Sequence, residues 1–426
     1  MTEQTLIIGA GPAGLGAALA LGEQAVVLEA GPDTGGLCRT ITLDGAVFDL
    51  GGHSFHTPHP NIRELVFQSL AMEEQKRQAF CYFRGQQIPF PFQKHFEQVH
   101  DGSIREACRN GLAAAGDKRP VTNFDEYLNS RFGEGISRHF LRPYNQKLWG
   151  KDLGRLAVDW TPERVPAPAG TSERFLSQGG KRTPLQDGTT VAYPAKGGFG
   201  KIFRALAKRI ANLHFSKRVV RIDPAKREVS TADGSVFSWH QLISTLPIPR
   251  LLDLLPSVPA WITRAVRDLE ILPMSLVLVV GNGRLDTPIQ RFYCADPEIP
   301  AHKIVLNHNS SSYLRGLPRH GIMAEIAGPR KETGQQLIQQ VIDGLRTLGL
   351  TSFADNVRQA RIIRLEFGYP VPTHSRSEIV GGVKYWLSAR GIQTLGRFGE
   401  WAYINSDEAL HRGHNLGHRL LQRAAA

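Results

Sequence analysis

Three glycines and a carboxylate near the start of the chain could bind a dinucleotide. Gly9, Gly11 and Gly14 follow a short apolar run, and Glu29 ends a second apolar run. In a strand–turn–helix–strand unit the first glycine permits the turn, the second lets the backbone approach a pyrophosphate, and the third brings helix and strand together. The helix N-terminus attracts phosphate, and Glu29 can accept hydrogen bonds from ribose hydroxyls. Because a carboxylate there disfavours a 2′-phosphate, NADP is disfavoured; a glycine-rich turn without a ligand is the alternative.

The elements that must position these residues are typical of an α/β protein. Apolar runs predict strands over 5–8 and 25–28, with a helix to about residue 21 between them. Further helices are expected over 61–80, 123–150, 201–213 and 335–348. Further strands are expected over 215–222, 228–230, 235–238, 241–244, 275–280, 304–306, 322–326 and 362–367. Residues 164–170 and 177–190 are expected to form a loop or linker region.

Composition favours a soluble protein that binds acidic ligands. The 426 residues are 41% hydrophobic and carry 51 Lys and Arg against 39 Asp and Glu, a net charge of +12. No apolar run approaches the roughly 20 residues of a membrane span. Because the first strand is predicted to begin almost at Met1, we expect no secretory signal. The four cysteines, at 38, 81, 108 and 294, are widely spaced, so we expect a reducing cytoplasm, no disulfide framework and no metal site. The charge suits a dinucleotide and a phosphorylated or nucleotide-linked substrate, and no nucleic-acid-binding module accompanies it.

The segment after Glu29 indicates a flavin. Gly35-Gly36-Leu37-Cys38-Arg39 resembles the glycine–glycine–x–x–arginine segment of the amine oxidase and protoporphyrinogen oxidase group of FAD proteins. The resemblance implies that the glycines run beside the diphosphate and that Arg39 supplies positive charge; an exposed loop is the alternative. Val219-Val220 resembles the valine pair that brackets the adenine in this group. Leu242–Pro247 resembles the strand that returns the chain to the FAD domain.

Further motifs resemble the UDP-galactopyranose mutases, especially their eukaryotic branch. Together with the dinucleotide unit they run from residue 9 to about 409, nearly the whole chain. Tyr369-Pro370 stands 28 residues before Arg397, as the family spacing requires. The motifs are the G-G-H loop in Phe48–His56, the P-F-Q segment in Phe90–Gln93, the R-P-Y-N-x-K-x-W helix in Leu141–Trp149, the glycine turn in Tyr193–Gly200 and the G-R-F-G-x-W-x-Y segment in Gly396–Tyr403.

This resemblance implies flavin chemistry without net oxidation. In these mutases reduced FAD uses N5 as a nucleophile on the anomeric carbon of a nucleotide-linked sugar and displaces the diphosphate. The sugar recloses on a different hydroxyl, which converts a pyranose into a furanose. The protein then mainly binds, orients and balances charge.

The resemblance also assigns roles to residues. His53 would lie against the isoalloxazine ring. Arg397, Tyr369 and Tyr403 would hold diphosphate oxygens, with Arg142 nearby, since guanidinium groups and phenols donate to phosphate. Substrate contacts are implied for Phe92, Gln93, Asn145, Trp149, His302 and Lys303. FAD contacts are implied for Gly9, Gly11, Pro12, Ala13, Gly14, Glu29, Ala30, Gly35, Gly36, Leu37, Arg39, Gly51, Gly52, His53, Val219, Val220, Thr245, Gly396, Asp407, Glu408 and Ala409.

Structural alternatives stand beside these roles, and the chain departs from the family at three places. His53 could be an ordinary hydrogen-bonded loop histidine. The two tyrosines and Phe92 could be core aromatics, and Asn145 and Trp149 could stabilise their helix.

At the first departure from the family, His302 or Lys303 stands where the family has an essential arginine. A lysine restores the charge but not the two-pronged geometry of a guanidinium. Gly188 or Thr189 replaces an expected asparagine, and Phe90 replaces a tyrosine on the uridine side. These departures fall on the substrate rather than on the flavin.

Two function classes follow from the sequence. The first is a flavin-dependent pyranose–furanose mutase acting on a nucleotide-linked sugar. The second is an FAD-dependent oxidase or dehydrogenase of the protoporphyrinogen or amine oxidase type. Besides these two enzyme classes, a flavin-binding structural protein is a further alternative. The mutase needs reduced flavin from NAD(P)H or a partner protein, and a homo-oligomer is possible. Loops near His53 and over 170–190 are expected to close on substrate.

The expected organisation has three parts. A discontinuous Rossmann-like FAD-binding domain would comprise residues 1–60, 191–250 and 380–426. Residues 61–190 would form a mainly helical cap, and residues 251–379 an antiparallel β-sheet substrate domain.

Overall fold

The computed structural model describes residues 4–116, 120–150, 152–165 and 188–425. The N-terminal prediction is confirmed: β1 (Thr5–Ile8) leads through the glycine turn into α1 (Pro12–Leu21), and β2 (Ala25–Leu28) follows. Both strands are entirely buried, as parallel strands covered on both faces usually are. Their parallel sheet has the order β19–β13–β1–β2–β9 and is completed by β9 (Leu213–His214), β13 (Gln241–Ser244) and β19 (Ile392–Thr394).

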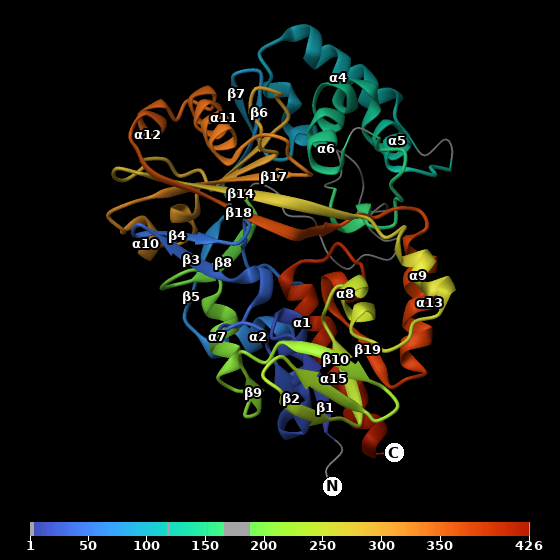
Figure 1. Cartoon of the computed structure of the whole chain (residues 1–426). Helices are drawn as coiled ribbons and strands as arrows, with labels where there is room; N and C mark the ends of the chain where they lie inside the picture. Colours follow the sequence, from blue (N-terminus) through green and yellow to red (C-terminus); the bar gives the residue numbers. More distant parts are fainter. Residues whose placement is uncertain (1–3, 117–119, 151, 166–187, 426) are drawn as a thin grey trace.

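The C-terminal helix α15 (Ser406–Ala425) crosses α1 at very short range, and the two chain ends lie at the same end of the molecule (Figure 1). A Cβ atom on Gly413 would lie 2.0 Å from the carbonyl oxygen of Ala13. A Cβ atom on Gly16 would lie 2.2 Å from the carbonyl oxygen of Leu410. Glycine is therefore required on both helices for the backbones to approach this closely.

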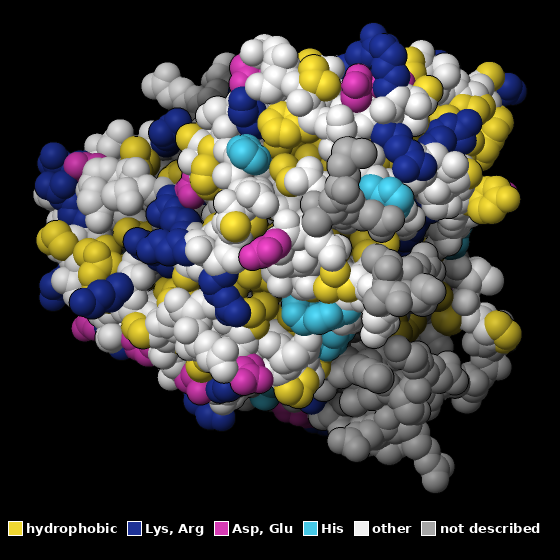
Figure 2. Space-filling model, turned by 90° about the horizontal axis from the view of Figure 1, so that it is seen from below, with side chains coloured by type: hydrophobic (Ala, Val, Ile, Leu, Met, Phe, Trp, Pro, Cys, Tyr) yellow, Lys and Arg dark blue, Asp and Glu magenta, His cyan; other side chains and the backbone are white. Residues whose placement is uncertain are grey.

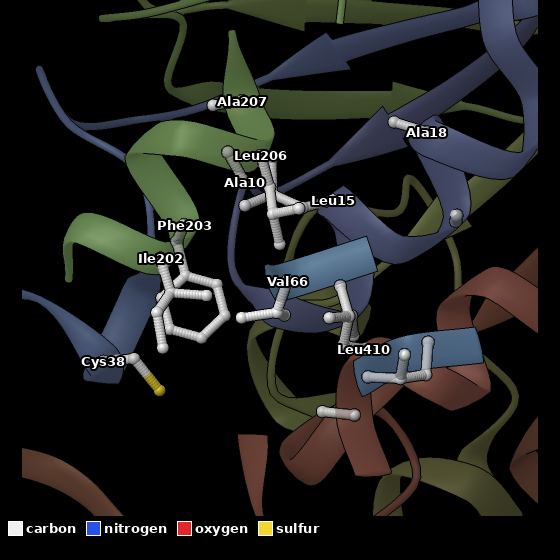
Figure 3. Packing of buried hydrophobic residues seen from close by; sticks show 14 of the residues in the cluster. Ala10, Leu15, Ala18, Cys38, Val66, Ile202, Phe203, Leu206, Ala207 and Leu410 are labelled. Atoms are coloured by element: carbon white, nitrogen blue, oxygen red, sulfur yellow. The ribbon is translucent and has the colours of Figure 1, made fainter. Parts of the chain in front are cut away.

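An apolar core on one side of α1 holds the glycine turn in place. Figure 3 shows Ile202, Phe203 and Leu206 of α7 (Lys201–Ala207) beside Leu15 of α1 and Val66 of α2 (Pro60–Ser69). All five side chains are at most 2% exposed. Burying side chains of this size stabilises the fold by about 1.5–3 kcal/mol each.

A seven-stranded sheet forms the second half of the molecule (Figure 1). Helices α11 (Gly334–Thr347) and α12 (Thr351–Asp355) pack their apolar side chains against it. All its pairs are antiparallel except that of β15 with β6. In spatial order the strands are β18 (Val357–Pro370), β14 (Ile271–Gly281), β17 (Gly321–Ala327), β16 (Lys303–Val305), β15 (Arg291–Cys294), β6 (Ala79–Phe83) and β7 (Gln86–Pro89).

A helical group packs at one end of this sheet around a third apolar core. It contains α4 (Gly102–Ala114), α5 (Phe124–Ile136) and α6 (Arg142–Trp149), and a π-helical turn joins the last two. The prediction of mostly helical structure over 123–150 is confirmed. The other elements are β3 (Thr40–Leu43), β4 (Ala46–Asp49), β5 (Met72–Lys76), α3 (Phe92–His95), β8 (Thr190–Pro194), β10 (Val219–Asp223), β11 (Glu228–Thr231), β12 (Val236–Ser238), α8 (Ile248–Asp253), α9 (Ala260–Val266), α10 (Ser312–Arg315), α13 (Arg376–Ser388) and α14 (Gly396–Gly399).

Two predicted helices are wrong in extent. The helix expected over 61–80 ends at Ser69, and β5 and β6 follow. β5 pairs with β8, more than a hundred residues later, so no local pattern could reveal its partner. The helix expected over 201–213 ends at Ala207, because residues 213–214 join the parallel sheet as β9.

The face of the molecule seen from below carries scattered positive charge. Figure 2 shows Lys and Arg in several small groups on one face, with Asp and Glu between them. In the part of the chain that the structure describes, no helix combines the length and apolar character needed to cross a bilayer. All four cysteines are buried and free.

Candidate active site

A cavity of about 470 Å³ lies between the two sheets. At one end the turn after β1, with Gly9 and Gly11, lines it together with Glu29. At the other end Lys303 and Glu325 line it from the seven-stranded sheet. The cavity therefore joins the dinucleotide-type turn to a field of charged and aromatic side chains.

The glycine-turn end has the features that a dinucleotide requires. Gly11 precedes α1 without any side-chain cap, so the helix offers free N–H groups. The carboxylate of Glu29 accepts hydrogen bonds from the N–H groups of Ala10 at 2.9 Å and Gly31 at 2.8 Å, which holds it at the cavity wall. Gly36 lies beside this turn, since a Cβ on Gly11 would meet its Cα at 4.0 Å, an ordinary van der Waals distance. The groove beside the two turns is thus lined by backbone, and its donors and carboxylate fit a pyrophosphate and a ribose.

Most of the residues predicted to contact the cofactor share this cavity, and some do not. Val220 is 48% exposed. Arg39 donates to the carbonyl of Gly36, and Glu408 pairs with His59 and Arg412, so neither side chain faces the cavity. The predicted residues that line the cavity are Gly9, Gly11, Pro12, Ala13, Glu29, Gly36, Leu37, Gly51, Gly52, His53, Thr245, Gly396 and Ala409. The predicted residues outside its lining are Gly14, Ala30, Gly35, Arg39, Val219, Val220, Asp407 and Glu408.

His53 is held at the cavity wall by packing. Its ring stacks on Phe199 at 4.9 Å between centroids, and its Nε2 lies 3.9 Å from the sulfur of Cys38. Burial, together with nearby cations, lowers the pKa of His53 to about 3, so the imidazole is neutral at physiological pH. Asp49 fixes Phe199: its carboxylate accepts from the N–H of Phe199 at 2.9 Å and from the neighbouring Tyr193 Oη at 2.5 Å. The ring next to the predicted flavin position is therefore an uncharged, rigid group.

Buried neutral histidines predict a loss of stability in acid. Burial and the neighbouring His320 lower the pKa of His308 to about 3, whereas an unfolded histidine titrates near 6.5. As pH falls below about 6.5 the unfolded chain takes up a proton that the folded chain does not, so the free energy of unfolding decreases. Urea titrations at pH 7.5 and 5.5 should show that His308→Leu reduces the difference in stability between these two pH values by about 1.4 kcal/mol in total. Identical dependence in both proteins would contradict the assignment. His308 lies outside the cavity lining, so the variant leaves the candidate site unchanged.

A row of side chains crosses the sheet beneath His53. Tyr293 pairs with Lys303 across β15 and β16, and Lys303 pairs with Glu325 across β16 and β17, so all three point to the cavity face. The ammonium of Lys303 lies 2.6 Å from the Glu325 carboxylate, which also accepts from the N–H of Gly52 at 2.6 Å. Glu325 is 1% exposed. It therefore ties the His53 loop to the sheet and neutralises Lys303.

The expectation that His302 or Lys303 replaces the family arginine needs correction. Burial lowers the pKa of His302 to about 3, so its ring carries no charge. The charge of Lys303 is already balanced by Glu325. Both residues line the cavity, but neither supplies a free cation for a substrate.

The residues predicted to hold a diphosphate lie together. The rings of Tyr369 and Tyr403 meet edge to face at 5.1 Å, and the Arg397 guanidinium lies 5.5 Å from the Tyr369 ring. Arg397 also donates twice to the carbonyl of Ile404, which fixes its direction. Burial raises the pKa of Tyr403 to about 12 and raises that of Tyr369, so both phenols remain protonated donors. The group combines one oriented cation with two neutral hydroxyl donors.

Two predicted site residues are elsewhere. Arg142 forms ion pairs with Asp125 and Glu134 and does not line the cavity, because its helix turns it toward α5. Phe92 is completely buried in the helical core, where its ring stacks on Phe140 at 4.5 Å. The apolar alternative was thus correct for Phe92. Gln93, Asn145 and Trp149 do line the cavity.

Several cavity residues had no role in the sequence prediction. Arg77, Tyr144, Arg164, Arg291, Tyr293 and Glu325 all contribute to the lining. Arg164 lies over the ring of Tyr403 at 4.3 Å and donates to its carbonyl oxygen. The alternation of Arg291 and Tyr293 with Phe292 could have predicted a strand with both polar residues on one face. Most of residues 164–190 lie outside the described part of the chain.

This architecture is that of an FAD-dependent enzyme, with a dinucleotide groove leading into a cavity lined by charged and aromatic side chains. The chain belongs to the flavin containing amine oxidoreductase family, whose model matches residues 12–348.

Solved structures extend the comparison. A structure of reduced UDP-galactopyranose mutase has a TM-score of 0.88 and 25% identity, over 100% of this chain and 95% of that one. A putrescine oxidase bound to putrescine has a TM-score of 0.69 and 15% identity, over 99% of this chain and all of that one. A CLA-producing fatty acid isomerase from P. acnes has a TM-score of 0.67 and 15% identity, over 98% of each chain. The last two show the shared fold, and the family implies FAD as the cofactor.

Proposed function

We propose that the protein is a flavin-dependent pyranose–furanose mutase acting on a nucleotide-diphosphate sugar. The group formed by Arg397, Tyr369 and Tyr403 carries this proposal, because it offers a diphosphate an oriented guanidinium and neutral donors in the cavity beside the dinucleotide groove. The 25% identity to a reduced UDP-galactopyranose mutase over the whole chain supports it.

The side chains around the cavity suit the demands of such a reaction. When bound in its reduced state, FAD supplies a nucleophilic nitrogen, N5, for attack at the anomeric carbon. Arg397 and Arg164 then stabilise the negative charge that develops on the departing diphosphate. Neutral His53 adds no positive charge beside the isoalloxazine position, and its stacking on Phe199 keeps it in place. Because the diphosphate must return to the same sugar, a cavity that retains it favours isomerisation over hydrolysis.

The amides of Gln93 and Asn145 suit a nucleobase. Both residues line the cavity, and the side-chain N–H group of Asn145 already donates to the carbonyl of Leu141 at 2.8 Å, which fixes its orientation. Amide groups can read the edge of a base.

An FAD-dependent oxidase or dehydrogenase is the second candidate, because the family is named for amine oxidation and a putrescine oxidase shares the fold. The cavity chemistry argues against an amine. Arg77, Arg164, Arg291 and Arg397 line it, and their charges would repel a cationic substrate.

The deciding assay is anaerobic. Protein with bound FAD is reduced with dithionite and incubated with UDP-, GDP- and dTDP-sugars, and products are separated by chromatography. We expect one sugar to be converted between its pyranose and furanose forms by the reduced protein, and no conversion by the oxidised protein. If no sugar is isomerised and another compound bleaches the oxidised flavin, the protein is an oxidoreductase. Adding NADH or NADPH in place of dithionite tests whether a nicotinamide is the electron donor.

A further inference from the structure

Arg291 is a buried cation that the proposed mechanism leaves without a task. It lies on β15, two residues from Tyr293, so both side chains face the cavity. It is 6% exposed, and its Nη2 donates to Ser54 Oγ at 2.6 Å. Among the described residues no carboxylate forms an ion pair with it. A buried guanidinium without a counter-charge is costly, so such a group in a cavity indicates an anionic ligand.

Two other cations of the cavity already have a counter-charge or an assigned ligand. Lys303 is paired with Glu325, and Arg397, which lies against Tyr369, is assigned to the diphosphate. Tyr369 is on β18, and three strands, β14, β17 and β16, separate β18 from β15 in the sheet. Arg291 therefore forms a second guanidinium–phenol group with Tyr293, apart from the group assigned to the diphosphate.

The surroundings of Tyr293 show how positive this second group is. Burial alone would raise the pKa of a phenol, yet the nearby charges of Arg77, Arg291 and Lys303 lower the pKa of Tyr293. The Nη2 of Arg77 lies 2.5 Å from the Tyr293 hydroxyl. An anion beside Tyr293 and Arg291 would enter a favourable field.

The position of Arg291 identifies which part of the substrate it meets. Ser54, its hydrogen-bond acceptor, directly follows His53 in the chain. If His53 lies against the isoalloxazine, as the proposed function requires, the neighbouring volume holds the sugar, whose anomeric carbon must reach the flavin. A neutral hexose offers only hydroxyls there, whereas a carboxylate can pair with both arms of a guanidinium.

We propose that Arg291 is a specificity-determining residue that binds a carboxylate on the sugar, so that the substrate is a nucleotide-linked acidic sugar such as a hexuronate. This inference rests on the proposed mutase function and narrows its substrate class.

The test compares ligands that differ only in this carboxylate. Flavin fluorescence of the FAD-bound protein is titrated with UDP, UDP-glucose and UDP-glucuronate, with UDP-galactose and UDP-galacturonate, and with GDP, GDP-mannose and GDP-mannuronate. We expect an acidic sugar to bind at least about tenfold more tightly than its neutral counterpart. Arg291→Gln should abolish this preference and leave the affinity for the free nucleoside diphosphate unchanged. Arg291→Lys should retain part of the preference, and the exposed Arg264→Gln should retain all of it.

Each other outcome overturns the inference. Equal binding of acidic and neutral sugars by the wild-type protein would overturn it. This comparison needs no variant, so it remains valid even if Arg291→Gln fails to fold. Weaker binding of UDP or GDP alone to Arg291→Gln would place Arg291 on the diphosphate. A changed flavin reduction potential with unchanged sugar preference would place it on the cofactor. If the wild-type protein binds and isomerises none of these ligands, the proposed function itself fails.

Discussion

An Arg397→Met variant should keep its FAD but lose roughly 100-fold or more of kcat/KM for sugar isomerisation. Truncating one partner of a buried charge pair costs about 2–5 kcal/mol, and each 1.36 kcal/mol is a factor of ten in rate. Arg397 is the cation of the group that carries the proposed function, and methionine keeps its length while removing charge and donors. Turnover is measured with reduced protein on the substrate found in the assay above.

Two further variants separate binding from folding. Arg397→Lys keeps the positive charge but not the two-pronged geometry of the guanidinium, so it should lose less activity than Arg397→Met. Arg264→Met removes an exposed arginine on α9 and should leave activity unchanged. Because Arg397 also binds the Ile404 carbonyl, flavin absorbance and the thermal midpoint are recorded for each protein. Full activity of Arg397→Met, with product and FAD content as in the wild type, would remove the basis for the diphosphate assignment.

A Gly413→Ala variant should lose about 3 kcal/mol of stability and bind FAD more weakly. A Cβ at this position would lie 2.0 Å from the Ala13 carbonyl oxygen, a distance no real contact reaches, so α15 must move away from α1. Overpacking of this kind costs about 1–3 kcal/mol, and here the obstacle is backbone, which cannot change rotamer. Ala13 also lines the cavity, so the displacement reaches the cofactor groove. Thermal unfolding and release of flavin on dilution measure the two effects.

The matched control is a glycine in another helix with open space around it. Gly381 lies in α13, and a Cβ there would meet nothing within 4 Å. Gly381→Ala should stabilise the protein by about 0.5–1 kcal/mol through helix propensity. If Gly413→Ala and Gly381→Ala changed the stability in the same direction, the close packing of α1 against α15 would not explain why position 413 needs a glycine.

Local patterns were sufficient for the dinucleotide turn. The strand, glycine turn, helix and second strand occupy residues 5–28, and Gly14 is required by a neighbour within the same unit, the Gly9 carbonyl. The long helix α11 was likewise predictable, because its apolar face repeats at helical spacing and a Thr333–Gln336 capping box starts it. Resemblance then led to His53, Arg397, Tyr369 and Tyr403, which the structure brings into one cavity.

The sequence by itself therefore determined the FAD-type turn, the family and the ligand-facing motifs, because these depend on residues close together in the chain. Only the tertiary structure decided what the charged side chains meet. Lys303 is neutralised by Glu325 from the next strand, and Arg142 is paired with Asp125 instead of a phosphate. Among the described residues, Arg291 has no counter-charge beside the His53 loop because its neighbours in the sheet, Ala79 and Val305, are apolar. Sheet order and register set the surroundings of Lys303 and Arg291, and helix packing sets the partner of Arg142. No spacing along the chain encodes them.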